Sequence, residues 1–228
     1  MSSHRFSHKF LPLGVILVAL SFPCQLRSQG VEFIKAHYTK HEYQIPMRDG
    51  VRLFTAVYAP KETSRKHPML LIRTQSGVLP YGVNEYPTTL GPSSLFAKEG
   101  YFFVYQDVRG RWMSEGTFVN TRPHNPAKKT PQDIDESSDC FDTIDWLLKH
   151  VPNHNGKVGL YGTSYRGFYV AAGMIDAHPA LKAASPQAPI MDKFMGDDWH
   201  PHGAFFLPHA FFYTPRTGTP RPEPTSKP

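Results

Sequence analysis

Ser164 stands between glycines in the stretch GLYGTSYRGFYV, residues 159–170. A short apolar run ends just before this serine, and aromatic and small residues follow it. On a sharp turn from a buried strand into a helix, a serine hydroxyl is exposed at the carboxyl edge of a sheet, above unpaired helix N–H groups. That position suits the nucleophile of an acyl-transfer reaction.

The spacing of the glycines leaves a second interpretation open. Gly162 lies two residues before Ser164 and Gly167 lies three after it, which gives G-x-S-x-x-G, looser than G-x-S-x-G. An ordinary glycine-rich turn, with the serine capping the following helix, has the same local pattern. The elements around the turn must decide between the two.

Strands and helices are predicted to alternate around this turn. Residues 43–60 contain two alternating runs about Arg48-Asp49-Gly50, which predicts an antiparallel hairpin. We predict an α/β fold with a mostly parallel sheet, covered on both faces and opened by this hairpin. The further predicted strands are residues 67–74, 101–110, 156–162 and 181–189, and the predicted helices are residues 91–100, 130–150 and 164–179.

The clearest helical pattern covers residues 130–150. Thr130 is placed to cap the helix and Pro131 to occupy its first turn, while Asp133 and Asp135 favour the positive end of the helix dipole. The apolar residues fall largely on one face. These are Ile134, Phe141, Ile144, Leu147 and Leu148.

The two ends of the chain differ in character from its centre. Residues 1–30 resemble an export signal, with Arg5 and Lys9 before an apolar run of about a dozen residues. That run is shorter than the ~20 residues needed to span a bilayer, so we expect an exported protein, periplasmic or secreted, without a stable membrane anchor. Residues 31–213 form the predicted α/β domain, and the proline-rich residues 214–228 are expected to be disordered.

Composition excludes several classes of protein. The chain is 40% hydrophobic and 13% aromatic, as in a folded globular protein. The net charge of +6 is spread along the sequence without a dense basic face, so we expect no nucleic-acid partner. If the signal is removed beyond Cys24, Cys140 is left without a disulfide partner. We expect no cofactor and no metal, and the oligomeric state stays open.

Six motifs in this order give a resemblance to a known family. They are MRDGVRL, QDVRGRWMSEG, DTIDWL, NGKVGLYGTSYRGF, HPALKAASPQAP and GDDW, between about Tyr43 and Tyr213. Together they resemble the X-Pro dipeptidyl-peptidases, cocaine-esterase-type hydrolases and α-amino-acid ester hydrolases. The resemblance implies an α/β-hydrolase fold, with this chain ending before the cap and the last strands.

The same resemblance implies roles for particular residues. Ser164 matches the family's nucleophile, and the backbone N–H of Tyr165 would donate to the oxyanion. Asp198 matches one carboxylate of the cluster that holds the substrate's free ammonium group, and we expect the adjacent Trp199 of the motif GDDW to bind substrate as well. A structural alternative for Asp197 and Asp198 is capping of the next helix.

Two departures from the family pattern affect the expected activity. The family has Arg-Thr-Pro-Tyr after the third strand, and that tyrosine is the second oxyanion donor, whereas this chain has Gln75 and Ser76 in place of Pro and Tyr. Ser76, through a water, or Tyr81, from the following loop, are the weak substitutes. Loss of one oxyanion donor typically costs on the order of 10²–10³ in turnover.

The second departure concerns the base that would activate Ser164. No residue of this chain matches the family's catalytic Asp or His. His178 is better explained by a structural role at a helix end, and the spacing in HPHGAFFLPH, with His200, His202 and His209, fits no standard zinc pattern. We therefore expect a serine hydrolase of the ester or amide acyl-transfer class that is inactive as this chain alone; a non-catalytic remnant or an exported binding module is the alternative.

Overall fold

The computed structural model describes residues 29–192, 194, 199–217 and 223–227. In chain order the elements in these ranges are α1 Val31–His37, β1 Tyr38–Pro46, β2 Arg52–Pro60, β3 His67–Thr74, α2 Ser94–Lys98, β4 Phe102–Asp107, α3 Glu136–His150, β5 His154–Thr163, α4 Tyr165–Gly173, β6 Leu181–Gln187, the 3-10 helix η1 Pro201–Gly203 and α5 Leu207–Thr217. Residues 1–28 of the predicted export signal lie outside them. Among the described helices, none has the length and apolar character to cross a membrane.

The six described strands form one sheet in the order β1-β2-β4-β3-β5-β6. The hairpin β1–β2 and the pair β2–β4 are antiparallel, whereas β4–β3, β3–β5 and β5–β6 are parallel. The prediction of a mostly parallel sheet opened by an antiparallel hairpin is confirmed. Because the parallel strands all end at the same edge, the loops that follow them meet there, and Ser164 lies directly after β5.

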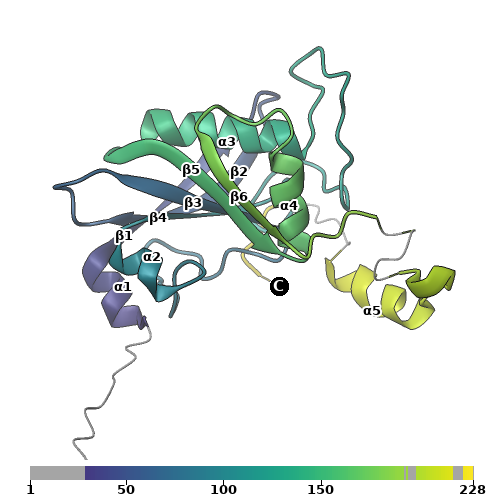
Figure 1. Ribbon diagram of the computed structural model, residues 1–228, viewed down its shortest axis with the longest axis horizontal. Helices are drawn as coiled ribbons and strands as arrows, with labels where there is room; N and C mark the ends of the chain where they lie inside the picture. Colours follow the sequence, from purple (N-terminus) through teal and green to yellow (C-terminus); the bar gives the residue numbers. More distant parts are fainter. Residues whose placement is uncertain (1–28, 193, 195–198, 218–222, 228) are drawn as a thin grey trace, which may run out of the picture.

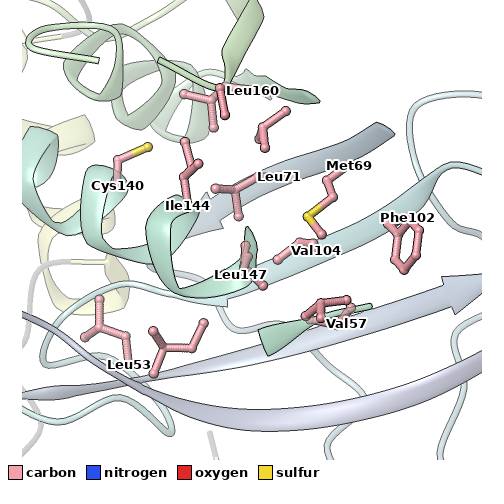
Figure 2. Packing of buried hydrophobic residues seen from close by; sticks show 14 of the residues in the cluster. Leu53, Val57, Met69, Leu71, Phe102, Val104, Cys140, Ile144, Leu147 and Leu160 are labelled. Atoms are coloured by element: carbon pink, nitrogen blue, oxygen red, sulfur yellow. The ribbon is translucent and has the colours of Figure 1, made fainter. Parts of the chain in front are cut away.

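Helices cover the sheet on both faces (Figure 1), α3 and α4 on one and α1 and α2 on the other. Alternate strand residues separate into the two layers, as a period of two requires. On β2, Val57 faces α3, while Ala56 and Tyr58 belong to the opposite cluster. Figure 2 shows Ile144 and Leu147 of α3 beside Leu71 and Val104 of the sheet.

The N-terminus of α3 corrects one sequence-based prediction. Thr130 does not cap the helix, because its hydroxyl and N–H donate to the Asp133 carboxylate in a turn that precedes it. Asp135 is the N-cap, and it exchanges hydrogen bonds with Ser138 in a capping box. Asp135 also accepts from Lys128 at 2.6 Å, which fixes the incoming loop to the cap. The helix therefore begins at Glu136.

Two further boundaries differ from the predicted ones. The helix predicted over residues 164–179 ends at Gly173, and Asp176 has φ of 50°, a left-handed value that a continuing helix cannot contain. The expected start of the disordered tail, at residue 214, falls inside α5, which continues to Thr217 despite Pro215.

A buried ionic network joins the hairpin, β3, β4 and α3. Arg109, just after β4, makes two-pronged contacts with Asp139 of α3 and with Asp49 of the hairpin turn, each at 2.7 Å at its closest. Arg73 of β3 donates to the main-chain oxygen of Glu136 at 2.8 Å, and its guanidinium lies 3.2 Å from the Glu136 carboxylate and 3.7 Å from that of Asp139. Asp139 is thus the carboxylate shared by two buried arginines.

We predict that Asp139→Ala lowers the free energy of unfolding by about 1.5–3 kcal/mol, because it removes the charged hydrogen bonds of the carboxylate that two buried arginines share, while Arg109 keeps Asp49 and Arg73 keeps Glu136 as partners. The measurement is a urea titration at neutral pH. The control is Asp145→Ala, which breaks an exposed pair with Lys149 on the same helix and is expected to cost about 0.5 kcal/mol or less. Equal losses for the two variants would show that the network does not hold the fold.

Candidate active site

Ser164 has an unusual backbone conformation at the junction of β5 and α4. Its φ is 60° and its ψ is −123°, and its side chain makes no capping hydrogen bond to α4. The Ser164 N–H donates to the Gln187 carbonyl at 2.9 Å, and its carbonyl accepts from Phe168 N–H at 3.1 Å. The residue is exposed. The capping interpretation therefore does not apply, and the hydroxyl stands at the carboxyl edge of the sheet.

The two glycines of the motif permit this geometry. A Cβ atom at Gly162 would lie 2.6 Å from the carbonyl oxygen of Arg166. A Cβ atom at Gly167 would lie 2.7 Å from the carbonyl oxygen of Gln187 and 3.2 Å from that of Gly162. The distances of 2.6 and 2.7 Å are shorter than a real Cβ atom tolerates, so only glycine allows β5, α4 and β6 to approach this closely.

Tyr165 begins α4 immediately after the serine. The first N–H groups of a helix have no partner within the helix, so the Tyr165 N–H can stabilise negative charge beside Ser164. The Tyr165 ring is buried; its hydroxyl donates to the Asn120 side chain at 2.6 Å and accepts from Thr121 N–H at 2.8 Å. Burial raises the pKa of Tyr165 to about 12, so the phenol is neutral at physiological pH. These bonds fix the start of α4 to the loop after β4.

Ser76, one of the two predicted substitutes for the second oxyanion donor, lies in the loop after β3 at the carboxyl edge of the sheet. Ser76 is exposed, and its N–H donates to the Thr74 hydroxyl at 3.1 Å. The preceding Gln75 carbonyl accepts from the Arg111 guanidinium at 3.0 Å and from the Trp112 indole at 3.2 Å. The backbone before Ser76 is therefore fixed by the loop after β4.

The other substitute, Tyr81, has its hydroxyl engaged elsewhere. It donates to Asp107 at 2.8 Å, and the same carboxylate oxygen accepts from Met113 N–H at 3.2 Å. In this conformation the Tyr81 hydroxyl is directed at the end of β4 and not at the turn between β5 and α4 that contains Ser164, which we call the elbow. Sequence reasoning missed Asp107, although an acidic residue at the end of a buried strand was a visible signal. Burial raises the pKa of Asp107 to about 7.

A cavity of about 580 Å³ opens beside the elbow. Its lining comes from the ends of β3 and β5, the loop after β3 and the first turn of α4. Thr163 and Arg166 line it on either side of Ser164, which is not itself part of the lining. A second hollow, of about 840 Å³, lies over β3, β5 and β6 and includes the starts of these strands, with Lys157 and Lys182 among its lining residues.

The remaining predicted site residues lie elsewhere or outside the described ranges. Asp197 and Asp198 lie outside the described residues. The Trp199 carbonyl accepts from Phe206 N–H at 2.8 Å, so Trp199 belongs to the segment that leads into α5. The His178 ring packs on Phe141 of α3, with centroids 4.8 Å apart. No three His, Cys, Asp or Glu side chains of the described ranges are grouped as a metal site would require.

Strain at position 164 gives a testable expectation for stability. A positive φ with this ψ costs a non-glycine residue on the order of 1–3 kcal/mol, and glycine avoids most of that cost. We predict that Ser164→Gly raises the free energy of unfolding by about 1 kcal/mol, measured by urea titration, while Thr163→Gly, in the extended end of β5, lowers it. A destabilised Ser164→Gly variant would contradict the strained elbow.

The raised pKa of Asp107 predicts a pH dependence of stability. In the folded state the neutral carboxyl is favoured up to about pH 7, whereas the unfolded carboxyl ionises near 3.8. The stabilising contribution is thus complete below the unfolded pKa and is lost as pH rises through about 7. We expect the melting temperature to fall less between pH 5 and pH 8 in Asp107→Asn than in the wild type. Exposed Glu85→Gln is the control, and a profile of Asp107→Asn parallel to the wild type would refute the assignment.

Known proteins resemble this chain in sequence and in structure. The sequence profile of the X-Pro dipeptidyl-peptidase (S15 family) matches residues 49–226. A curated relative, the cocaine esterase of Rhodococcus sp. (strain MB1 Bresler), is 31% identical over 175 residues, which cover 77% of this chain and 28% of the esterase.

Two solved structures are similar over most of the chain. An α-amino acid ester hydrolase has a TM-score of 0.69 and 36% identity, covering 92% of this chain and 34% of its own. An aminopeptidase from a marine sediment archaeon, Thaumarchaeota archaeon, has a TM-score of 0.67 and 34% identity, covering 92% of this chain and 32% of its own. The chain thus spans about a third of the length of these relatives.

These relatives are hydrolases, and the mostly parallel sheet with its helices on both faces is the α/β-hydrolase fold, as predicted. The resemblance seen in the six sequence motifs is confirmed over more than half of the chain. The chain belongs to the X-Pro dipeptidyl-peptidase (S15) family of esterases and peptidases.

Proposed function

We propose that this chain carries the nucleophile of an exported serine hydrolase that acts on esters or amides by acyl transfer. The observation that carries the proposal is the position of Ser164. Its hydroxyl is exposed at a strained strand–helix junction, it caps no helix N–H, and the first N–H of α4 follows it directly. An ordinary capping serine needs neither the strain nor the exposure.

In the proposed reaction, Ser164 Oγ forms a bond to the substrate carbonyl carbon while its proton passes to a general base. The Tyr165 N–H donates to the carbonyl oxygen as that oxygen becomes negative, with Ser76 as the second donor. Collapse of the intermediate expels the alcohol or amine, which takes the proton, and water then hydrolyses the acyl-enzyme. Since no residue here matches the family's catalytic His or Asp, we assign the base to a polypeptide segment other than the 228 residues.

The proposed substrate is a small ester, amide or short peptide with a free amino group. An α-amino acid ester hydrolase and an aminopeptidase are among the similar structures, and both names denote substrates with an amino group. Asp198, in the motif GDDW, is the proposed partner of that ammonium group, with Trp199 beside it. A carboxylate of this kind would orient the substrate before the acyl group is transferred.

The proposal is tested by supplying the base from solution. We predict that 4-nitrophenyl acetate alone acetylates Ser164 slowly, and that added imidazole raises the rate at Ser164 roughly tenfold. A diffusing base supplies only part of the 10²–10⁴ that a positioned base contributes. Peptide mass spectrometry measures acetylation at Ser164 and, in the same sample, at the exposed Ser64.

The comparison of Ser164 with Ser64 in one sample tests whether the elbow itself increases the reactivity of the serine. Imidazole acts on any exposed hydroxyl, so only a larger response at Ser164 than at Ser64 supports an oxyanion-stabilising site. The variant Gly167→Ala, which pushes α4 away from β6, should remove that difference. Equal acetylation of the two serines in the wild type would refute the proposed nucleophile and favour a non-catalytic binding module.

A further inference from the structure

The cavity beside the elbow has an uneven distribution of charge. Among the described residues that line it, Arg166 is the one charged side chain, and neither Asp nor Glu is present. The other polar groups of the lining are hydroxyls, one amide and main-chain atoms. A ligand in this cavity therefore meets a positive charge that no lining carboxylate neutralises.

Arg166 is placed to act inside the cavity. It lies on the first turn of α4, two residues after Ser164, and it is exposed. Burial raises the pKa of Tyr105 and of Tyr161, and the positive charge of Arg166 partly offsets the rise for both phenols. The guanidinium therefore lies close enough to these two cavity-lining hydroxyls to influence them.

Tyr105 supplies a hydrogen-bond donor at the same place. Its hydroxyl accepts from Gly91 N–H at 2.8 Å and interacts with the Tyr161 hydroxyl. A phenol carries one proton, so this pair of hydroxyls can donate a hydrogen bond to a ligand. The raised pKa of Tyr105 keeps its phenol protonated at physiological pH.

The walls around these polar groups are apolar. The side chains that form them are Ile72, Val78, Leu79, Pro87 and Pro92. A volume of about 580 Å³ is in the range of small-ligand sites, which combine apolar walls with a few placed polar groups. The cavity fits a short hydrocarbon that ends in an anion.

We propose that this cavity binds a carboxylate group of the substrate, with Arg166 as its ion-pair partner and Tyr105 as a hydrogen-bond donor. Arginine suits this role because its planar guanidinium can bind both oxygens of a carboxylate. The link to substrate rests on the proposed function of Ser164, whereas the binding of a carboxylate does not. The inferred substrate class is an ester, amide or peptide with a free carboxylate.

The test compares an acid with its neutral isostere. The probes are 4-phenylbutyrate and 4-phenylbutyramide, titrated into the purified 228-residue chain by isothermal titration calorimetry at pH 7. A charge-assisted hydrogen-bonded pair contributes about 1.5–3 kcal/mol, so the carboxylate should bind at least about tenfold more tightly than the amide. We predict that Arg166→Gln brings the two dissociation constants together. Since Arg166 is exposed, this variant is expected to fold, which circular dichroism verifies.

Two variants separate this inference from simpler explanations. Lys157→Gln removes one exposed positive charge that lies outside the cavity lining and should leave the preference intact. Ser164→Ala should also keep it, so the binding site stands even if the acetylation experiment fails. Equal binding of acid and amide by the wild type, or a preference unchanged in Arg166→Gln, would overturn the proposal. Loss of the preference for the acid over the amide in Lys157→Gln would show that the preference arises from net charge and not from Arg166.

Discussion

The close contact between the start of α4 and the end of β6 is the constraint on which the rest of the site depends. Because Gly167 lies against the carbonyl of Gln187, α4 must begin within one residue of the end of β5. The chain can turn that sharply only through a residue with positive φ, and Ser164 occupies that position. The next residues then follow in fixed directions: the Tyr165 N–H at the start of the helix, and Arg166 at the rim of the cavity.

Support for that contact extends through α3 to the buried ionic network at the same edge of the sheet. On its other side α4 packs against α3 closely enough that a Cβ at Gly173 would lie 2.9 Å from Cys140 Sγ. The beginning of α3 is in turn held by Asp139 between the two buried arginines. Arg73 of the same network lies 5.8 Å from the centre of the Tyr169 ring, so the buried charges also contact α4 directly. A shift of α3 would therefore displace the elbow at Ser164, although no residue of the ionic network is close to Ser164 in the sequence.

The local sequence pattern was sufficient to predict the structure wherever a single interaction determines the local conformation. The strand over residues 67–74 follows from an apolar run buried on both faces, and the elbow follows from glycines where side chains have no room. The cap of α3 was not predictable in this way, because several polar residues compete for it and Lys128 helps to select Asp135. The contact of Tyr81 with Asp107 joins residues 26 positions apart, and no spacing rule reports it. The lining of the cavity beside Arg166 likewise requires coordinates, because it brings together residues of five strands, the loop after β3 and the first turn of α4.

The two proposed recognition groups have opposite charges, and that combination explains how a weakened oxyanion site could still be selective. A substrate held at its amino group by Asp198 and at a carboxylate by Arg166 has only one orientation in which both charges are paired. A neutral ester gains nothing from either group and can bind in several orientations. Fixing the reacting carbonyl over Ser164 reduces the entropy that must be lost in the transition state, and well-oriented reactants gain as much as about 7–11 kcal/mol in favourable systems. If Ser76 is the weaker oxyanion donor that we propose, orientation of the substrate by these two charges would offset part of that loss.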